Sequence, residues 1–270
     1  MALDLTEYFE KYEAVAAEAT AAFDKICEGV DFDVKCGKGC SDCCHAVFDL
    51  TLIEALYLNH KFNEQFKGDG AGKSAVLERA DTADRQVYQL KRRAFKATQE
   101  GRTATEILQE MSKARIRCPL LDEKEGCEIY DARPITCRLY GVPTVIEGSA
   151  KTCHISGFEP GKAYPSIHMD VLMNKLHQLS REVAKHVRTR YAELADMLVP
   201  VSMALATDYD EHYLGCMSEE EVAKKEELRK KLVAESLEAG MQKGPESACS
   251  GCGDTDITIP GHVQGEEGDK

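Results

Sequence analysis

Four cysteines within nine residues are the feature that most constrains this chain. They stand in segment 36–44, which reads Cys-Gly-Lys-Gly-Cys-Ser-Asp-Cys-Cys. Four more follow between residues 118 and 153, so eight of the twelve cysteines form two groups: Cys36, Cys40, Cys43, Cys44, Cys118, Cys127, Cys137 and Cys153. Glycines let a backbone wrap closely around a bound ion, and thiolates bind zinc, copper(I) or iron–sulfur clusters. We therefore predict all eight cysteines as metal ligands.

The start of the chain is acidic and does not resemble a signal peptide. The chain also lacks an apolar run of the roughly 18 residues that a membrane-spanning helix needs. We therefore expect a cytoplasmic protein that does not associate with a membrane. Thiols stay reduced in the cytoplasm, so clustered cysteines there favour metal binding over disulfides.

The formal net charge of −13 argues against nucleic acid as the partner, because nucleic-acid binders are normally basic. A protein partner is the expectation instead. One stretch, 73–117, is locally basic with 11 Lys and Arg against 6 Asp and Glu. It is typical of a solvated helix face, and the alternative is a docking surface for an acidic partner.

Apolar residues at helical spacing predict a mainly α-helical fold that encloses a cysteine-rich, loop-built metal site. Thr51 with Glu54 and Thr103 with Glu106 form capping boxes that start two of the helices. The pattern predicts helices at 4–28, 51–66, 73–99, 103–111, 166–198 (the longest, between Pro165 and Pro200) and 218–240, a loop at 67–72, and short strands at 141–146 and 255–259.

Three regions follow from this pattern. Residues 1–200 form a helical domain that contains the cysteine-cluster unit 36–153, residues 201–243 a charged helical extension, and residues 244–270 a flexible acidic tail. The tail holds a CxxC pair, Cys249 and Cys252, which fits a redox dithiol, half of a metal site or two free thiols.

Coordination numbers limit the site. Zinc and a cubane cluster each take four protein ligands, so eight cysteines fill two sites, or one site with spare thiols. Side chains of adjacent residues diverge in an extended strand, which favours separate places for Cys43 and Cys44. His45 and His154 each follow a cysteine and are alternative ligands.

At these residues the chain resembles the YkgJ-type cysteine-cluster family, a zinc- or iron-chelating domain with a CxxCxxCC signature that is related to flagellin lysine N-methylases. The resemblance covers residues 36–153, and its first cysteine gap has three residues here in place of two. It rests on the run 36–44, on Cys118-Pro119-Leu120 and Cys127-Glu128-Ile129-Tyr130, and on Arg133-Pro134 with Cys137-Arg138-Leu139-Tyr140. It implies metal chelation and favours an iron–sulfur cluster.

The metal is expected to be a 4Fe-4S cluster, with zinc as the alternative, because the donors are almost all cysteine and the second group lacks paired CxxC knuckles. Arg133 and Arg138 are predicted to lie beside the cofactor and to offset the negative charge of a cluster with four thiolates.

Two classes of function stay open. One is a cluster-binding protein for electron transfer, maturation or sensing, or a structural zinc module; the other is a cluster-dependent enzyme such as a protein lysine methylase. Cys36-x3-Cys40-x2-Cys43 also has the spacing of radical SAM enzymes. However, Asp42 stands where those enzymes usually carry an aromatic residue, and this chain lacks their series of βα units.

Overall fold

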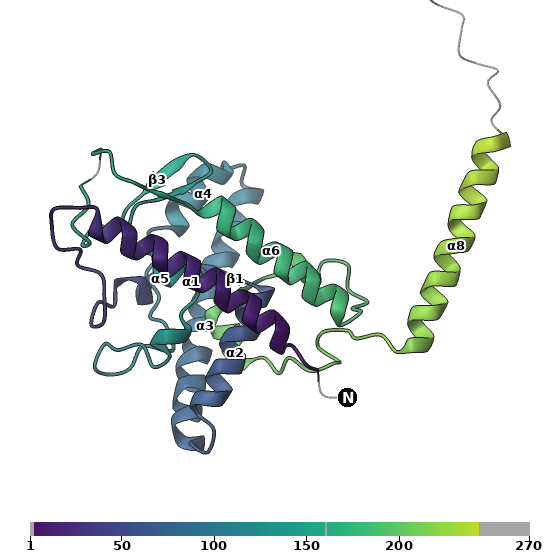
Figure 1. Ribbon diagram of the computed structural model, residues 1–270, viewed down its shortest axis with the longest axis horizontal. Coiled ribbons are helices and arrows are strands. Elements are labelled where there is room, and N and C mark those ends of the chain that lie inside the picture. The colour runs from purple at the N-terminus through teal and green to yellow at the C-terminus, as the bar shows by residue number, and fades with distance from the viewer. Residues whose placement is uncertain (1–2, 160, 243–270) are drawn as a thin grey trace, which may run out of the picture. The chain divides into compact units, whose positions relative to one another are not determined.

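The computed structural model describes residues 3–159 and 161–242. The chain divides into one compact unit, Met1–Met217, and a second unit, Ser218–Lys270. Helices make up most of the compact unit (Figure 1), which confirms the mainly α-helical prediction. None of the described helices combines the length and the apolar composition needed to cross a membrane.

The helices in chain order are α1 (Thr6–Glu28), the 3-10 helix η1 (Asp42–His45), α2 (Leu52–Gln65), α3 (Gly70–Gln99), α4 (Ala104–Met111), η2 (Tyr130–Ala132), α5 (Ile135–Leu139), α6 (Met169–His186), η3 (Leu194–Asp196), α7 (Val201–Ala206) and α8 (Glu219–Gln242). The strands are β1 (Asp49–Thr51), β2 (Thr144–Ile146), β3 (Ser149–Lys151), β4 (Ile167–His168) and β5 (Leu198–Pro200). β1 pairs with β5, and β3, β2 and β4 form a second small sheet.

The core lies between α1, α2 and α6. Helices α1 and α6 run side by side in Figure 1, and Tyr12, Ala16 and Ala19 form a buried stripe on α1. Leu176 and Val183 of α6 are fully buried. Each such apolar side chain contributes about 1.5–3 kcal/mol on burial, so this seam holds the helices that frame the cysteines.

Both predicted capping boxes are present, at Thr51 with Glu54 and at Thr103 with Glu106. The loop predicted at 67–72 is shorter, because α3 already begins at Gly70. The Asp69 side chain accepts a hydrogen bond from the Gly72 N–H at 2.9 Å, and this N-cap starts the helix. Helix α3 has 30 residues and is the longest described.

The prediction of one long helix over 166–198 was wrong, because α6 ends at His186. Arg188 adopts a left-handed φ of 51° and its N–H bonds to the Lys185 carbonyl at 3.1 Å. The Thr189 N–H bonds to the Ala184 carbonyl at 3.2 Å, which completes a Schellman motif. Glycine usually takes the left-handed position, so an arginine there left no stop signal in the sequence.

The strand predicted at 141–146 is confirmed over its second half, as β2. Strand β5 begins at Leu198, the last residue of the predicted helix, and it pairs antiparallel with β1 through Leu50 and Val199. The strand predicted at 255–259 and the pair Cys249 and Cys252 lie outside the described residues.

The compact unit includes residues 201–217, which the charge pattern had grouped with the extension. Helix α7 packs against α2 and α3. The Asn59 side chain of α2 donates to the Ala204 carbonyl at 2.9 Å, and Ser202 donates to the Asp84 carboxylate of α3 at 3.1 Å. These contacts explain why the first unit continues to Met217.

Helix α8 belongs to the second unit and begins where the sequence predicted. The Ser218 N–H bonds to the Glu221 carboxylate at 2.8 Å, and the Glu221 N–H bonds to the Ser218 hydroxyl at 3.3 Å. This reciprocal pair is a capping box, and three glutamates follow in the first turn.

Candidate metal centre

The backbone brings the two cysteine groups together. The Cys118 N–H donates to the Cys44 carbonyl at 2.7 Å, and the Ile116 N–H donates to the His45 carbonyl at 3.0 Å. Ala46 and Arg115 form an isolated antiparallel bridge beside them. Segments 69 to 74 residues apart in sequence are therefore paired neighbours, so the helices between them fold back.

Five thiols line one small cavity of about 60 Å³. We call Cys43, Cys44, Cys118, Cys127 and Cys137 the inner thiol cluster. The rest of the wall is largely apolar, with Phe48, Leu58 and Val87 among its side chains. Cys43 is only 9% exposed. The cavity therefore combines soft sulfur donors with a wall that excludes water.

Cys43 and Cys44 lie in the same cluster, which differs from the expectation that adjacent side chains diverge. Their segment is the 3-10 helix η1 and not an extended strand. The two Sγ atoms are 4.0 Å apart. The tight turn of this helix brings the side chains together, and the sequence carried no clear signal for it.

A hairpin holds Cys118 near Cys127. Leu121 and Cys127 form a backbone bridge, and the Glu128 N–H donates to the Leu120 carbonyl at 2.9 Å. The Asp122 carboxylate closes the turn by accepting the Gly126 N–H at 2.7 Å.

Arg79 of α3 clamps both arms of this hairpin. Its Nε donates to the Pro119 carbonyl at 2.8 Å, and its guanidinium forms an ion pair with Glu128. The residues next to Cys118 and Cys127 are thus tied to one helix.

Glu54 positions Cys137, the last thiol of the inner thiol cluster. Its Oε2 accepts the Thr51 N–H at 3.1 Å as part of the α2 capping box, and its Oε1 accepts the Ile135 N–H at 3.1 Å. Ile135 begins α5, which carries Cys137 one half-turn later. Burial raises the pKa of Glu54. Sequence reasoning identified the cap, and the contact with α5 left no local pattern to find.

Burial and mutual contact keep most of these thiols protonated in the absence of metal. Burial raises the pKa of Cys118 to about 12 and also raises the pKa of Cys127. Hydrogen bonding to Cys43 raises the pKa of Cys137 and of Cys44. The same contacts lower the pKa of Cys43.

Two backbone amides also point at sulfur. The Leu120 N–H bonds to the Cys118 thiol and the Ile129 N–H bonds to the Cys127 thiol, and each lowers the pKa of its cysteine against the effect of burial. Amide hydrogen bonds of this kind stabilise the charge of metal-bound thiolates.

The two predicted cofactor-side arginines have different surroundings. The Arg133 guanidinium lies 3.5 Å from the Tyr130 ring centre, lines the cavity and lowers the pKa of Cys127. Arg138 donates from Nε to the Arg133 carbonyl at 2.8 Å and also contacts the Asp131 carbonyl. Arg133 thus places its charge at the thiols, while Arg138 holds the backbone that carries Arg133.

The other three predicted ligands lie by a hollow on the surface. Cys36 and Cys40 line it together with Asp42. Burial raises the pKa of Cys36 to about 11. The Cys153 thiol contacts the Asp42 carboxylate at 3.4 Å.

Of the two histidine alternatives, His45 turns its Nδ1 to the Ser41 carbonyl at 3.1 Å, whereas His154 lies 3.9 Å from the Asp42 carboxylate. In the sequence, Asp42 stands out only as a departure from the radical SAM pattern, since a single acid carries no ligand signature.

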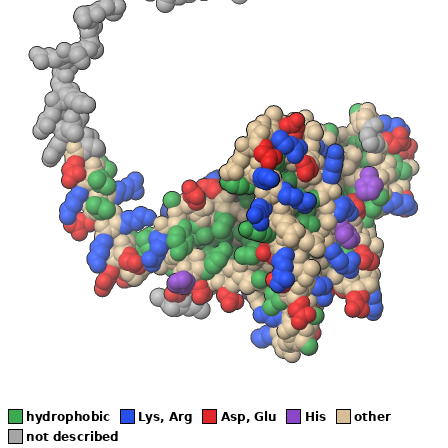
Figure 2. All heavy atoms as spheres, turned by 180° about the vertical axis from the view of Figure 1, so that it is seen from behind, with side chains coloured by type: hydrophobic (Ala, Val, Ile, Leu, Met, Phe, Trp, Pro, Cys, Tyr) green, Lys and Arg blue, Asp and Glu red, His purple; other side chains and the backbone are tan. Residues whose placement is uncertain are grey.

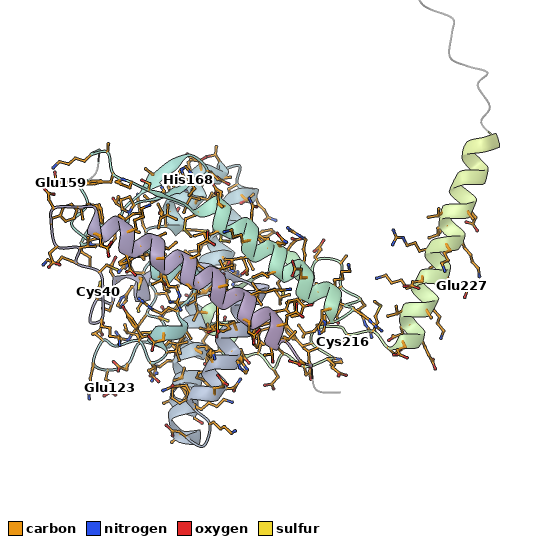
Figure 3. The ribbon with its side chains drawn as sticks, viewed as in Figure 1. Cys40, Glu123, Glu159, His168, Cys216 and Glu227 are labelled. Atoms are coloured by element: carbon orange, nitrogen blue, oxygen red, sulfur yellow. The ribbon has the colours of Figure 1, made fainter. Side chains whose placement is uncertain are left out.

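The remaining described cysteines line neither the inner cavity nor the hollow. Cys27 packs in a small satellite core, and Cys216 packs against the main core. Figure 3 shows Cys216 and Cys40 at opposite ends of the compact unit.

Comparison with protein families gives one match, to the CxxCxxCC family described as "Putative zinc- or iron-chelating domain", over residues 35–154. No curated protein and no solved structure matches the chain. The matched region contains all eight clustered cysteines and both arginines. Residues 35–154 therefore match the family that the cysteine motifs indicate.

Proposed function

We propose that the inner thiol cluster binds one 4Fe-4S cluster and that the protein uses it for electron transfer. The observation that carries this proposal is the all-sulfur donor set: five thiols meet at one apolar cavity. Cubane clusters are bound almost wholly by cysteine and take four such ligands. A cluster with four thiolates is anionic, and the Arg133 guanidinium beside Cys43 and Cys127 offsets that charge.

A bound cluster supplies one-electron redox chemistry. The chain's own residues bind it, exclude water and set its electrostatic surroundings. The apolar wall keeps the local dielectric low, while Arg133 and the amides of Leu120 and Ile129 favour the more negative, reduced form. These residues are therefore expected to determine the reduction potential.

Within the inner cavity, the lack of room for a substrate beside the cluster favours electron transfer over a methylase role. Pockets for small-molecule substrates commonly have volumes of ~300–1,000 Å³, whereas the cavity at these thiols has about 60 Å³. Electron transfer needs no substrate beside the cluster.

The electron donor or acceptor is proposed to be a protein with an acidic surface. Arg92 and Arg93 are exposed on α3, as are the large side chains of Tyr88 and Phe95. Figure 2 shows a face of the molecule on which hydrophobic side chains gather with Lys and Arg beside them.

A structural zinc ion is the second candidate, and one distance favours it. The 4.0 Å between the sulfurs of Cys43 and Cys44 is close to the ~3.8 Å expected across a zinc tetrahedron with Zn–S bonds of ~2.3 Å. The fifth thiol does not separate the two candidates, since zinc and a cubane each take four protein ligands.

Anaerobic purification tests the proposal. The full-length protein should be brown and contain about four iron and four sulfide ions per chain, as a cubane requires. Serine substitution of each inner thiol in turn should abolish iron loading at four positions and leave it intact at one. Stoichiometric zinc without iron or sulfide would establish the zinc candidate instead.

A further inference from the structure

A second cluster of metal-ligating side chains lies outside the inner cavity. The ligand atoms of Asp42, Cys153 and His154 all lie within 4.8 Å of one another. We call these three residues the outer cluster. Asp42 comes from η1 in the first cysteine group, and the other two close the second group. None of the three lines the cavity of the inner thiol cluster.

The Asp42 carboxylate is oriented before any ion binds. Its side chain is only 9% exposed, and Oδ1 forms an ion pair with Arg115. The Arg115 guanidinium also donates to the Asp42 backbone carbonyl at 3.1 Å, which fixes its direction. Oδ2 is therefore the oxygen that faces Cys153 and His154.

The Cys153 thiol is also prepared for a ligand role. It is 7% exposed and its sulfur lies 3.4 Å from Oδ2 of Asp42. Burial raises the pKa of Cys153, and the Ile155 N–H that bonds to its sulfur opposes this rise, as the Leu120 N–H does for Cys118 in the inner thiol cluster. The same local arrangement thus recurs at a second place.

His154 completes the set from the solvent side. Its side chain is 75% exposed, so the ring is free to turn toward the other two donors. Thiolate, imidazole and carboxylate are the three ligand types of zinc in proteins. A cubane cluster, by contrast, is rarely bound by carboxylate.

We propose that the outer cluster binds one exchangeable divalent ion of the zinc class, separate from the metal of the inner thiol cluster. Three protein ligands leave the fourth tetrahedral position to water, which is the arrangement of open zinc sites. Asp42, Cys153 and His154 are the ligands, and Arg115 is a positioning residue that holds the carboxylate.

Cobalt(II) is a suitable probe, because cobalt bound to thiolate absorbs visible light whereas zinc does not. Full-length protein loaded with its inner metal is titrated anaerobically with Co²⁺ and then with Zn²⁺. Asp42→Asn, Cys153→Ser and His154→Ala should each bind one Co²⁺ fewer than the unchanged protein, and Zn²⁺ should displace that ion. Arg115→Gln should weaken Co²⁺ binding at the outer cluster by ~10-fold or more, because the carboxylate ligand loses the partner that orients it.

His168→Ala is the matched control, because His168 is also exposed but lies in β4 outside the outer cluster. It should retain the ion. Equal Co²⁺ binding by His154→Ala and by the unchanged protein would overturn the proposal. A loss of inner iron or zinc in parallel with the lost Co²⁺ would overturn it too, since the residues would then belong to a single centre. Because the readout is a difference of one ion, it is independent of which metal fills the inner thiol cluster.

Discussion

At the scale of single residues, Gly141 shows how closely the two cysteine groups are packed. A Cβ at this position would lie 2.2 Å from both Cβ and Sγ of Cys36. The backbone after α5 therefore touches the first cysteine of the run, and only a residue without a side chain permits the contact.

Gly141→Ala should lower the free energy of unfolding by about 1–3 kcal/mol, the range for overpacking a close contact. Chemical denaturation of the metal-free protein measures it. Gly37→Ala is the control, because a Cβ there has no neighbour within 4 Å, and it should stay within about 0.5 kcal/mol. Equal stability of the two variants would mean that Cys36 simply moves aside.

The raised thiol pKa values predict a pH dependence of metal binding. Cys118 has a pKa of about 12 and that of Cys127 is also raised, so both thiols carry protons at neutral pH. A metal ion must displace these protons, and fewer remain to be displaced as the pH rises toward the pKa. Affinity should therefore increase with pH, by about tenfold per pH unit for each proton displaced.

Zinc or cobalt binding in weakly buffered solution with a pH indicator measures this proton release. Release should be stoichiometric with metal and should decrease by one proton in Cys118→Ser. Binding without proton release would show that the thiols are already ionised.

At the scale of elements, the junction between α2 and α5 depends on Glu54. Its carboxylate accepts hydrogen bonds from Thr51 and Ile135 with its two oxygens, and a glutamine side chain has only one acceptor oxygen. Glu54→Gln should lower the free energy of unfolding by about 1–3 kcal/mol through a buried unsatisfied group. Glu106→Gln changes the equivalent capping box on exposed α4. There a single carboxylate oxygen accepts both bonds from Thr103, and the one amide oxygen of glutamine can replace it, so this variant should cost less than about 1 kcal/mol. Urea unfolding compares the two.

The hairpin with Cys118 and Cys127 depends on its clamp from α3. Arg79→Ala removes the bonds to the Pro119 carbonyl and to Glu128, so iron or zinc affinity should fall by ~10-fold or more. Arg85→Ala on the same helix removes only an exposed pair with Asp81 and should leave metal affinity unchanged. Similar affinity in both variants would show that the hairpin keeps its shape alone.

At the scale of the whole molecule, the extent of the compact unit predicts the result of truncation. A chain that ends at Met217 keeps every element from α1 to α7, and it should bind metal as the full chain does. A chain that ends at residue 200 loses α7, which packs against α3 and α2. It should unfold at lower denaturant concentration and lose metal. Metal content and circular dichroism after purification distinguish the two boundaries.

The sequence predicted most helices because their signals are local. Apolar spacing identified α1, and the reciprocal Thr–Glu pairs marked α2 and α4. The end of α6 was missed because Arg188 occupies the left-handed position that glycine usually marks. The cysteines of the centre were visible as a motif, whereas the roles of Glu54, Arg79 and Asp42 depend on partners that are distant in sequence.

The hydrogen bond between Cys44 and Cys118 also imposes an order of events on synthesis. A ribosome adds ~5–20 residues per second, and Cys118, the first cysteine of the second group, stands 74 residues after Cys44, so its synthesis follows by roughly 4–15 seconds. During that interval the first four cysteines are part of a nascent chain that has no second group to meet. A complete metal centre is therefore assembled after translation of this region, and the early thiols depend on a reducing environment until then.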